Sequence, residues 1–543
     1  MRGLVTALLL LAARAGLVLH AVIFPARHRH YRFDLWLLPW IRRRRALSAG
    51  PPGREETRDL IFCFVDHFEP GTRGASLEQA QERFRAWTEG YPALARRFAD
   101  SDGRHPQHSF FFPPHYFREE YLSGLALMDW QGLGEVELHL HHAGDTSESL
   151  RSRLEETLSL YAGYGVFQCQ GDPIRQRYAF IHGNWALDNS RPEYCGVNDE
   201  LRVLAATGCF ADFTFPSLLA AQPRMVNALY RAVDDPAAPK SYERGRPMTA
   251  GRPPGPDEFP LLTGPIGLAR RRRFPFFTIE DADVTAENPG TPARVRGWVR
   301  EAIGVGGRPD WIFVKVHTHG APERHHDALL GLGAETMYRT LCEEFGDGRH
   351  FRLHFASARE MFNIARAAED GHAGDAGRFR DYEIAPYLTR FLRANVPYEA
   401  RRFVPAAREG TLPVLDLSLA LSQEQTASLE FRSGLLRAAS GRIASLQSPS
   451  LPMGPVHAAP AAAELRLGGA GGELDLFLLA GCGVNAAGTL LAPEAASSLA
   501  GAAVERFHLR LESGQILPLA IQAPAGAPSG AGAGEAPGGR GQA

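Results

Sequence analysis

The feature that most constrains the fold is an alternation of short apolar runs with helix-like segments between residues 57 and 369. Four apolar runs have the length of buried strands, and Leu77 to Phe98 is typical of the intervening helices. The runs are Leu60 to Val65, Glu135 to Leu140, Tyr178 to Ile181 and Trp311 to Val316. Strands separated by helices form parallel sheets or barrels, so the pattern predicts an α/β fold.

The rest of the chain divides by composition, because 543 residues exceed what one hydrophobic core organises. The run of Ala, Gly, Pro and Ser at the C-terminal end buries too little apolar area to fold. We predict an apolar membrane segment at 1–25, a basic and aromatic linker at 26–56, an α/β domain at 57–369 with a Pro- and Arg-rich insertion at about 234–275, a linker at 370–381, a smaller β-rich domain at 382–522 and a disordered tail at 523–543.

The N-terminal segment from Leu4 to Phe24 is long and apolar enough to cross a bilayer as a helix. Arginines are frequent after it and only Arg2 precedes it, which favours a cytoplasmic position for the rest of the chain. The tryptophans and arginines of the linker also fit a belt on anionic lipid, or a solvated basic linker. The alternative is a secretory signal cleaved near Ala13-Arg14-Ala15, which would make the protein periplasmic or secreted.

Charge and cysteine content exclude several classes of function. A formal net charge of -2 gives no general attraction to nucleic acid, and we expect no nucleic-acid partner. The six cysteines show no Cys-x-x-Cys spacing, which argues against a zinc finger and against a dense disulfide scaffold. Their scattered positions fit a reducing compartment slightly better than an oxidising one.

Histidines and carboxylates follow the predicted strands, at the end where parallel α/β folds place their sites. The first strand ends in Asp66, and Glu69 follows it. In the second strand, alternation places His139 and His141 on one face. Two imidazoles and a carboxylate from a neighbouring strand form the ligand set of catalytic zinc sites, although an exposed polar strand would show the same pattern.

Two further segments, 180–188 and 208–216, mix aromatic and polar residues. Such mixtures suit a sugar-binding cleft, where rings cover C–H surfaces and amides or carboxylates bind hydroxyl groups, and they also occur in capped loops beside a core. The candidates for substrate contact are His182, Asn184, Trp185, Asp188 and Asp212.

The last predicted strand carries His317 and, just beyond it, His319 on one face. An imidazole there could protonate a leaving group, because its ordinary pKa lies near neutral pH. Solvated histidines at a strand end are the alternative.

The order of these motifs resembles the polysaccharide deacetylase superfamily (NodB-homology, carbohydrate esterase 4-like) over about residues 57–365. The resemblance implies a distorted (β/α)7-type barrel, closed by a strand and helix after Leu353. It further implies a divalent metal, zinc by preference, held by Asp66, His139 and His141. His317 or His319 would act as the general acid.

The chain departs from the family pattern in two places. The family's first motif holds two adjacent aspartates, whereas this chain has Val65 before Asp66, so the catalytic base is unassigned and Glu69 is a candidate. Family members often place the two histidines four positions apart, whereas position 143 is Ala, and His142 is the second choice of ligand.

The expected function is metal-dependent removal of acyl groups, N-acetyl by preference, from a sugar or polysaccharide in envelope or exopolysaccharide metabolism. The N-terminal segment suggests a lipid-linked carbohydrate. Two alternatives stay open: a non-catalytic glycan-binding or assembly protein on the same barrel, and a glycoside hydrolase that uses carboxylates such as Asp66 and Asp212.

Overall fold

The computed structural model describes residues 31–47, 57–162, 164–169, 175–270 and 277–387, together with strands and turns between 392 and 522. The described residues form two compact units. One contains those up to 162 and from 176 to 386, and the other contains 164–169, Arg175 and those from Tyr387 onward. The predicted membrane segment 1–25 and tail 523–543 lie outside the described residues.

The first unit is built on one large sheet. Its strands are parallel from β13 to β10, and β8 and β9 continue it in antiparallel fashion. The order is β13 (Trp311–Thr318), β1 (Arg58–His67), β2 (His108–Phe112), β3 (Gly134–Leu140), β6 (Tyr178–His182), β7 (Cys209–Asp212), β10 (Glu258–Leu262), β8 (Leu229–Val233) and β9 (Gly245–Pro247), and β14 (Phe351–Ala356) also pairs with β1.

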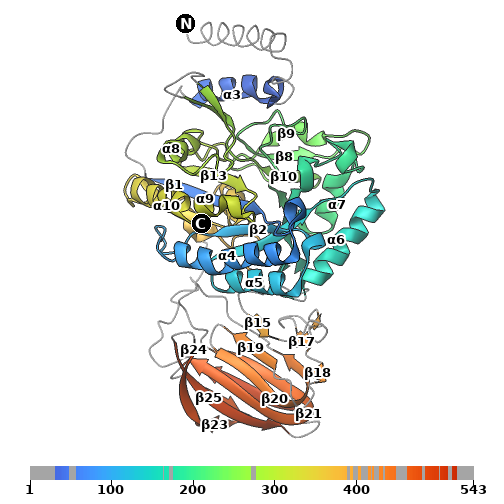
Figure 1. Cartoon of the computed structure of the whole chain (residues 1–543), viewed down its shortest axis with the longest axis vertical. Coiled ribbons are helices and arrows are strands. Elements are labelled where there is room, and N and C mark those ends of the chain that lie inside the picture. Colours follow the sequence, from blue (N-terminus) through green and yellow to red (C-terminus); the bar gives the residue numbers. More distant parts are fainter. Residues whose placement is uncertain are drawn as a thin grey trace, which may run out of the picture. The chain divides into compact units, whose positions relative to one another are not determined.

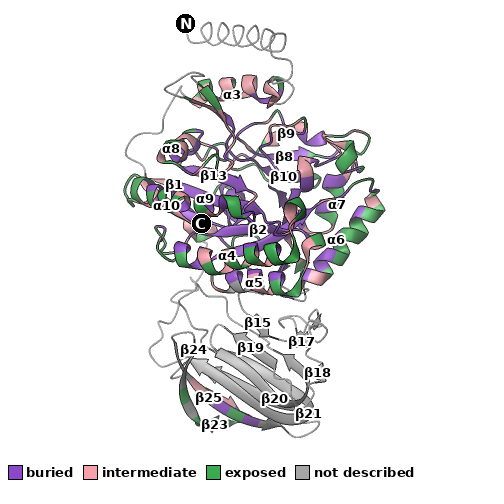
Figure 2. Cartoon of the chain, viewed as in Figure 1, coloured by how far each residue is buried: buried purple, intermediate pink, exposed green. Residues whose placement is uncertain are grey.

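Helices lie around this sheet, as Figure 1 shows for α4 to α7. They are α4 (Leu77–Ala95), α5 (Glu119–Trp130), α6 (Ser147–Ala162), α7 (Glu200–Ala206), α8 (Pro292–Arg300), α9 (His326–Leu329), α10 (Leu332–Phe345) and α11 (Ala358–Glu369). Every residue of β13, and every residue of β1 after Arg58, is buried (Figure 2). Such continuous burial is typical of parallel strands covered on both faces. The prediction of a mixed α/β unit with a mostly parallel sheet is confirmed.

The segment expected as an insertion at 234–275 belongs in part to the sheet. Its strand β10 pairs in parallel with β7 and in antiparallel fashion with β8. A separate hairpin of β11 (Gly267–Arg270) and β12 (Phe277–Glu280) follows. Of the predicted arginine run, Arg271 to Arg273 lie outside the described residues.

The segment expected as a linker at 26–56 contains helix α3 (Phe33–Leu47), which belongs to the first unit and packs against other parts of it. Trp36 is fully buried and forms a hydrophobic cluster with Val226 and Ile266. The Arg43 guanidinium donates hydrogen bonds to the carbonyl oxygens of Glu301 and Ala302. No helix among the described residues has both the length and the apolar character needed to span a bilayer.

Strands after Tyr387 form an antiparallel sheet in the second unit. Its main path runs through β15 (Leu392–Asn395), β19 (Ala427–Phe431), β20 (Gly434–Gln447), β21 (Ala462–Leu479), β26 (Ile516–Gln522), β22 (Gly483–Ala486) and β23 (Thr489–Leu491). The predicted linker 370–381 lies in the first unit, where it contains the short 3-10 helix η7 (Ala376–Phe379).

Candidate metal centre

A cavity of about 770 Å³ opens where the carboxyl ends of β1, β3 and β13 meet. Parallel strands bring their ends to one edge of a sheet, so residues from distant parts of the chain line the same space. Six of the lining residues are His67, Glu69, His139, His141, His317 and His319.

Three of these side chains turn their ligand atoms toward one another. Glu69 Oε1 lies 2.9 Å from His141 Nε2 and 3.7 Å from His139 Nε2, and the two Nε2 atoms are 3.0 Å apart. His139 Nδ1 lies 2.9 Å from the carbonyl oxygen of Ile181 on β6. A carbonyl only accepts, so this bond fixes the proton on Nδ1 and leaves the Nε2 lone pair facing Glu69 and His141.

The electrostatics of the trio suit a cation. Burial raises the pKa of the Glu69 carboxyl, but the hydrogen bond from His141 and the nearby His139 outweigh it and lower the pKa to about 2. Burial lowers the pKa of His139 to about 3. An ionised carboxylate and a neutral imidazole are the forms that bind metals. Two nitrogens and one oxygen at these separations could therefore hold a divalent ion such as zinc.

Asp66, the predicted ligand, faces a different set of groups. Its carboxylate is fully buried and accepts hydrogen bonds from the Gly320 amide (2.7 Å) and His108 Nε2 (3.0 Å). The structure thus places Glu69, which was predicted as a base, next to the histidine pair. His142, the second choice of ligand, turns away from the trio toward Glu200.

The predicted catalytic histidines His317 and His319 both line the cavity, and His67 joins them. The His67 ring stacks on the His319 ring, with 4.4 Å between centroids. Burial is the largest cause that lowers the pKa of all three. The neighbouring histidines lower the pKa of His67 further, and Lys315 and His319 lower the pKa of His317 further. The lowered pKa values favour the neutral form of all three imidazoles.

Asp281 and Asp283 line the same cavity and were not predicted. Burial, with a smaller effect of Asp281, raises the pKa of Asp283 to about 7. Their segment reaches the cavity because it pairs with the end of β13. The His317 amide donates to the Ala282 carbonyl oxygen, and the Val284 amide donates to the His317 carbonyl oxygen. The sequence signal was the cluster of acids at 280–283, which directly follows a short apolar run.

Of the predicted substrate contacts, Asn184 and Trp185 line the cavity. The other three do not line it, because their side chains hold other parts of the fold. Asp188 accepts hydrogen bonds from the Ser241 amide and hydroxyl, and Asp212 accepts them from the Thr214 amide and hydroxyl. His182 is fully buried and turns toward Glu200.

No protein-family model matches the chain. No curated protein matches it either.

Proposed function

We propose that the protein is a metal-dependent hydrolase that removes acyl groups, N-acetyl by preference, from a carbohydrate. The observation that carries the proposal is the Glu69, His139 and His141 trio on the wall of the cavity. A divalent cation held there supplies Lewis acidity toward an acyl oxygen and lowers the pKa of water. Both effects promote amide hydrolysis, which also requires groups that move protons.

Two kinds of side chain in the cavity can move protons. The Asp283 carboxyl has a pKa of about 7, so it exchanges a proton readily near neutral pH. His317 and His319 are neutral, and each can take a proton during attack by water and then donate it to the leaving nitrogen. We assign the acid and base roles to these three residues.

The cavity wall also supports a sugar as substrate. The indole of Trp185 offers an apolar face for the C–H surface of a sugar ring, and the Asn184 amide offers a donor and an acceptor for hydroxyl groups. We further propose that the sheet closes as a distorted barrel of the polysaccharide deacetylase kind. We also propose that the N-terminal apolar segment tethers the enzyme to a membrane, with the catalytic part cytoplasmic and the carbohydrate lipid-linked.

Acetate release tests the proposal. The full chain is incubated with N-acetylglucosamine oligomers, before and after treatment with a chelator and after zinc is restored. We expect release that chelation abolishes and zinc restores. His139→Ala should lower the rate by about a hundredfold or more, since even changes behind a metal ligand cost about 10- to 100-fold. His350→Ala, at an exposed histidine, is the matched control.

Three other outcomes would contradict the proposal or favour one of the alternative functions. Release that survives both chelation and His139→Ala would contradict the metal-dependent mechanism. Oligomers that bind without releasing acetate would favour the glycan-binding alternative, and metal-independent formation of new reducing ends would favour a glycosidase.

A further inference from the structure

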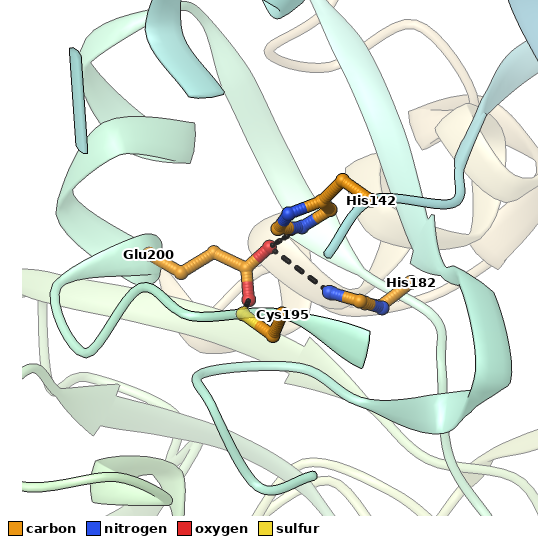
Figure 3. A group of neighbouring side chains, drawn as sticks. All are labelled: His142, His182, Cys195 and Glu200. Atoms are coloured by element: carbon orange, nitrogen blue, oxygen red, sulfur yellow. Dashed lines mark hydrogen bonds and ion pairs between the residues drawn. The ribbon is translucent and has the colours of Figure 1, made fainter. Parts of the chain in front are cut away.

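A second group of ligand-type side chains lies buried near the first. His142 follows β3, His182 ends β6, Cys195 lies in the loop after it, and Glu200 begins α7. None is more than 6% exposed. Figure 3 shows both imidazoles and the thiol turned toward the Glu200 carboxylate. None of the four lines the cavity, so the proposed hydrolytic site does not account for them.

We propose that His142, His182, Cys195 and Glu200 bind a zinc ion in a closed structural site. Glu200 Oε1 lies 3.0 Å from His142 Nε2 and 3.4 Å from His182 Nε2, and Glu200 Oε2 lies 3.6 Å from Cys195 Sγ. Tetrahedral zinc with ordinary bond lengths separates its ligand atoms by about 3.3–3.6 Å. Two imidazoles, a thiol and a carboxylate form a donor set that suits zinc, and four protein ligands leave no open position.

The hydrogen bonding of His182 supplies an independent argument. Its Nδ1 lies 2.6 Å from the Gly183 carbonyl oxygen, which only accepts, so the proton is on Nδ1. The buried Nε2 makes no hydrogen bond and faces the carboxylate oxygen of Glu200. A lone pair directed at a carboxylate is repulsive, whereas a cation between the two groups turns both into ligands.

The charge balance points the same way. Among the described residues, Glu200 has ion pairs with His142 and His182 and with no arginine or lysine. As zinc ligands, a glutamate, a thiolate and two neutral imidazoles would together carry two negative charges, which the divalent ion neutralises. The buried cluster around His354 differs, because Arg352 and Arg380 already balance the carboxylates of Asp59 and Asp102.

The position of the cluster indicates what the ion would do. The segment between His182 and Glu200 holds four non-glycine residues with positive φ: Asn184, Trp185, Asp188 and Asn189. Such backbone persists only where the surrounding structure enforces it. His182 and Cys195 lie on either side of this strained stretch, and Glu200 Oε2 accepts a 2.5 Å hydrogen bond from the Asp188 amide. The zinc site would thus fix the loop that presents Asn184 and Trp185 to the cavity.

The sulfur ligand gives the site a signature that the trio of Glu69, His139 and His141 cannot give. We would purify the full chain without chelator, measure its zinc content, and record zinc-edge X-ray absorption. We expect a zinc–sulfur contribution equivalent to one sulfur per chain, because the trio of Glu69, His139 and His141 contains no sulfur. After exchange with cobalt, a thiolate-to-cobalt charge-transfer band should appear in the near ultraviolet.

Variants assign that signature to residues. We expect Cys195→Ala to remove the zinc–sulfur contribution and the cobalt band, and Glu69→Ala to leave both unchanged when they are expressed per chain. Cys209→Ala is the matched control, since Cys209 is another buried thiol whose sulfur faces the Ala211 carbonyl. Both signals should survive in it.

The spectra of the unaltered chain decide the question even where Cys195→Ala fails to fold. Zinc with no sulfur ligand, or no bound zinc at all, would overturn the proposal, as would a sulfur signal that persists in folded Cys195→Ala. The proposal is independent of the hydrolase activity: a sulfur-bound zinc in a chain that releases no acetate supports this site and contradicts the proposed function alone.

Discussion

The carboxylates of Asp66 and Glu69 both lie at the end of β1, yet their surroundings give them different tasks. The Asp66 carboxylate accepts hydrogen bonds from Gly320 and His108. The Glu69 carboxylate faces His139 and His141 instead. We predict that Glu69→Gln weakens zinc binding at the trio by about a hundredfold or more, because the uncharged amide is a poor ligand. Calorimetric titration of metal-free protein with zinc measures this, with the Cys195 site as internal reference.

Asp66→Asn is the matched comparison, since it too exchanges a carboxylate for an amide of the same shape. The buried Asp66 carboxylate accepts two hydrogen bonds, whereas an amide has only one acceptor oxygen, so we expect the free energy of unfolding to fall by about 1–3 kcal/mol with zinc affinity unchanged. If Asp66→Asn loses zinc while Glu69→Gln keeps it, the aspartate is the ligand and our assignment is wrong.

At the scale of elements, the docking of α3 rests on a few contacts that can be removed singly. Trp36 is fully buried against Val226 and Ile266. We predict that Trp36→Ala lowers the free energy of unfolding of the first unit by about 3–5 kcal/mol, the usual cost of truncating a core tryptophan, or releases the helix. Chemical denaturation and limited proteolysis within 33–47 distinguish these two results.

Arg42→Ala, at an exposed position on the same helix, should leave both measurements unchanged. If Trp36→Ala also leaves the free energy of unfolding and the proteolysis pattern unchanged, the contacts of Trp36 contribute nothing to the stability of the unit.

The elements that sequence predicts well are those whose signal is local. The apolar runs of β1, β3, β6 and β13 have the length and burial expected of them. Local alternation also placed His139 and His141 on one face. By contrast, β10 was assigned to an insertion, because its place beside β7 depends on a partner that lies far along the chain.

The same limit applies to the sites. The sequence placed carboxylates and histidines at strand ends, but the choice of Glu69 over Asp66 depends on which way each side chain turns as β1 ends. Asp283 reaches the cavity only by pairing with the end of β13. Glu200 meets His142 only because α7 and the end of β3 come together in the fold. No pattern within one segment carries that information.

At the scale of the whole molecule, the described residues form two compact units, and both proposed zinc sites lie in the first. We therefore expect two unfolding transitions in calorimetry, and we expect zinc to raise the midpoint temperature of only one of them. A ligand at a hundred times its dissociation constant stabilises the folded state by about 2.7 kcal/mol, which corresponds to a few degrees in a unit of this size.

Cys195→Ala should remove part of the rise in midpoint temperature that zinc causes, because Cys195 is a proposed ligand. Cys209→Ala should remove none of it, because Cys209 is not a proposed ligand. The transition of the second unit should stay at the same temperature with and without zinc. If zinc raises the midpoint temperature of both transitions, or if calorimetry shows a single transition, the two units unfold cooperatively. Zinc binding would then stabilise the chain as one body instead of the α/β unit alone.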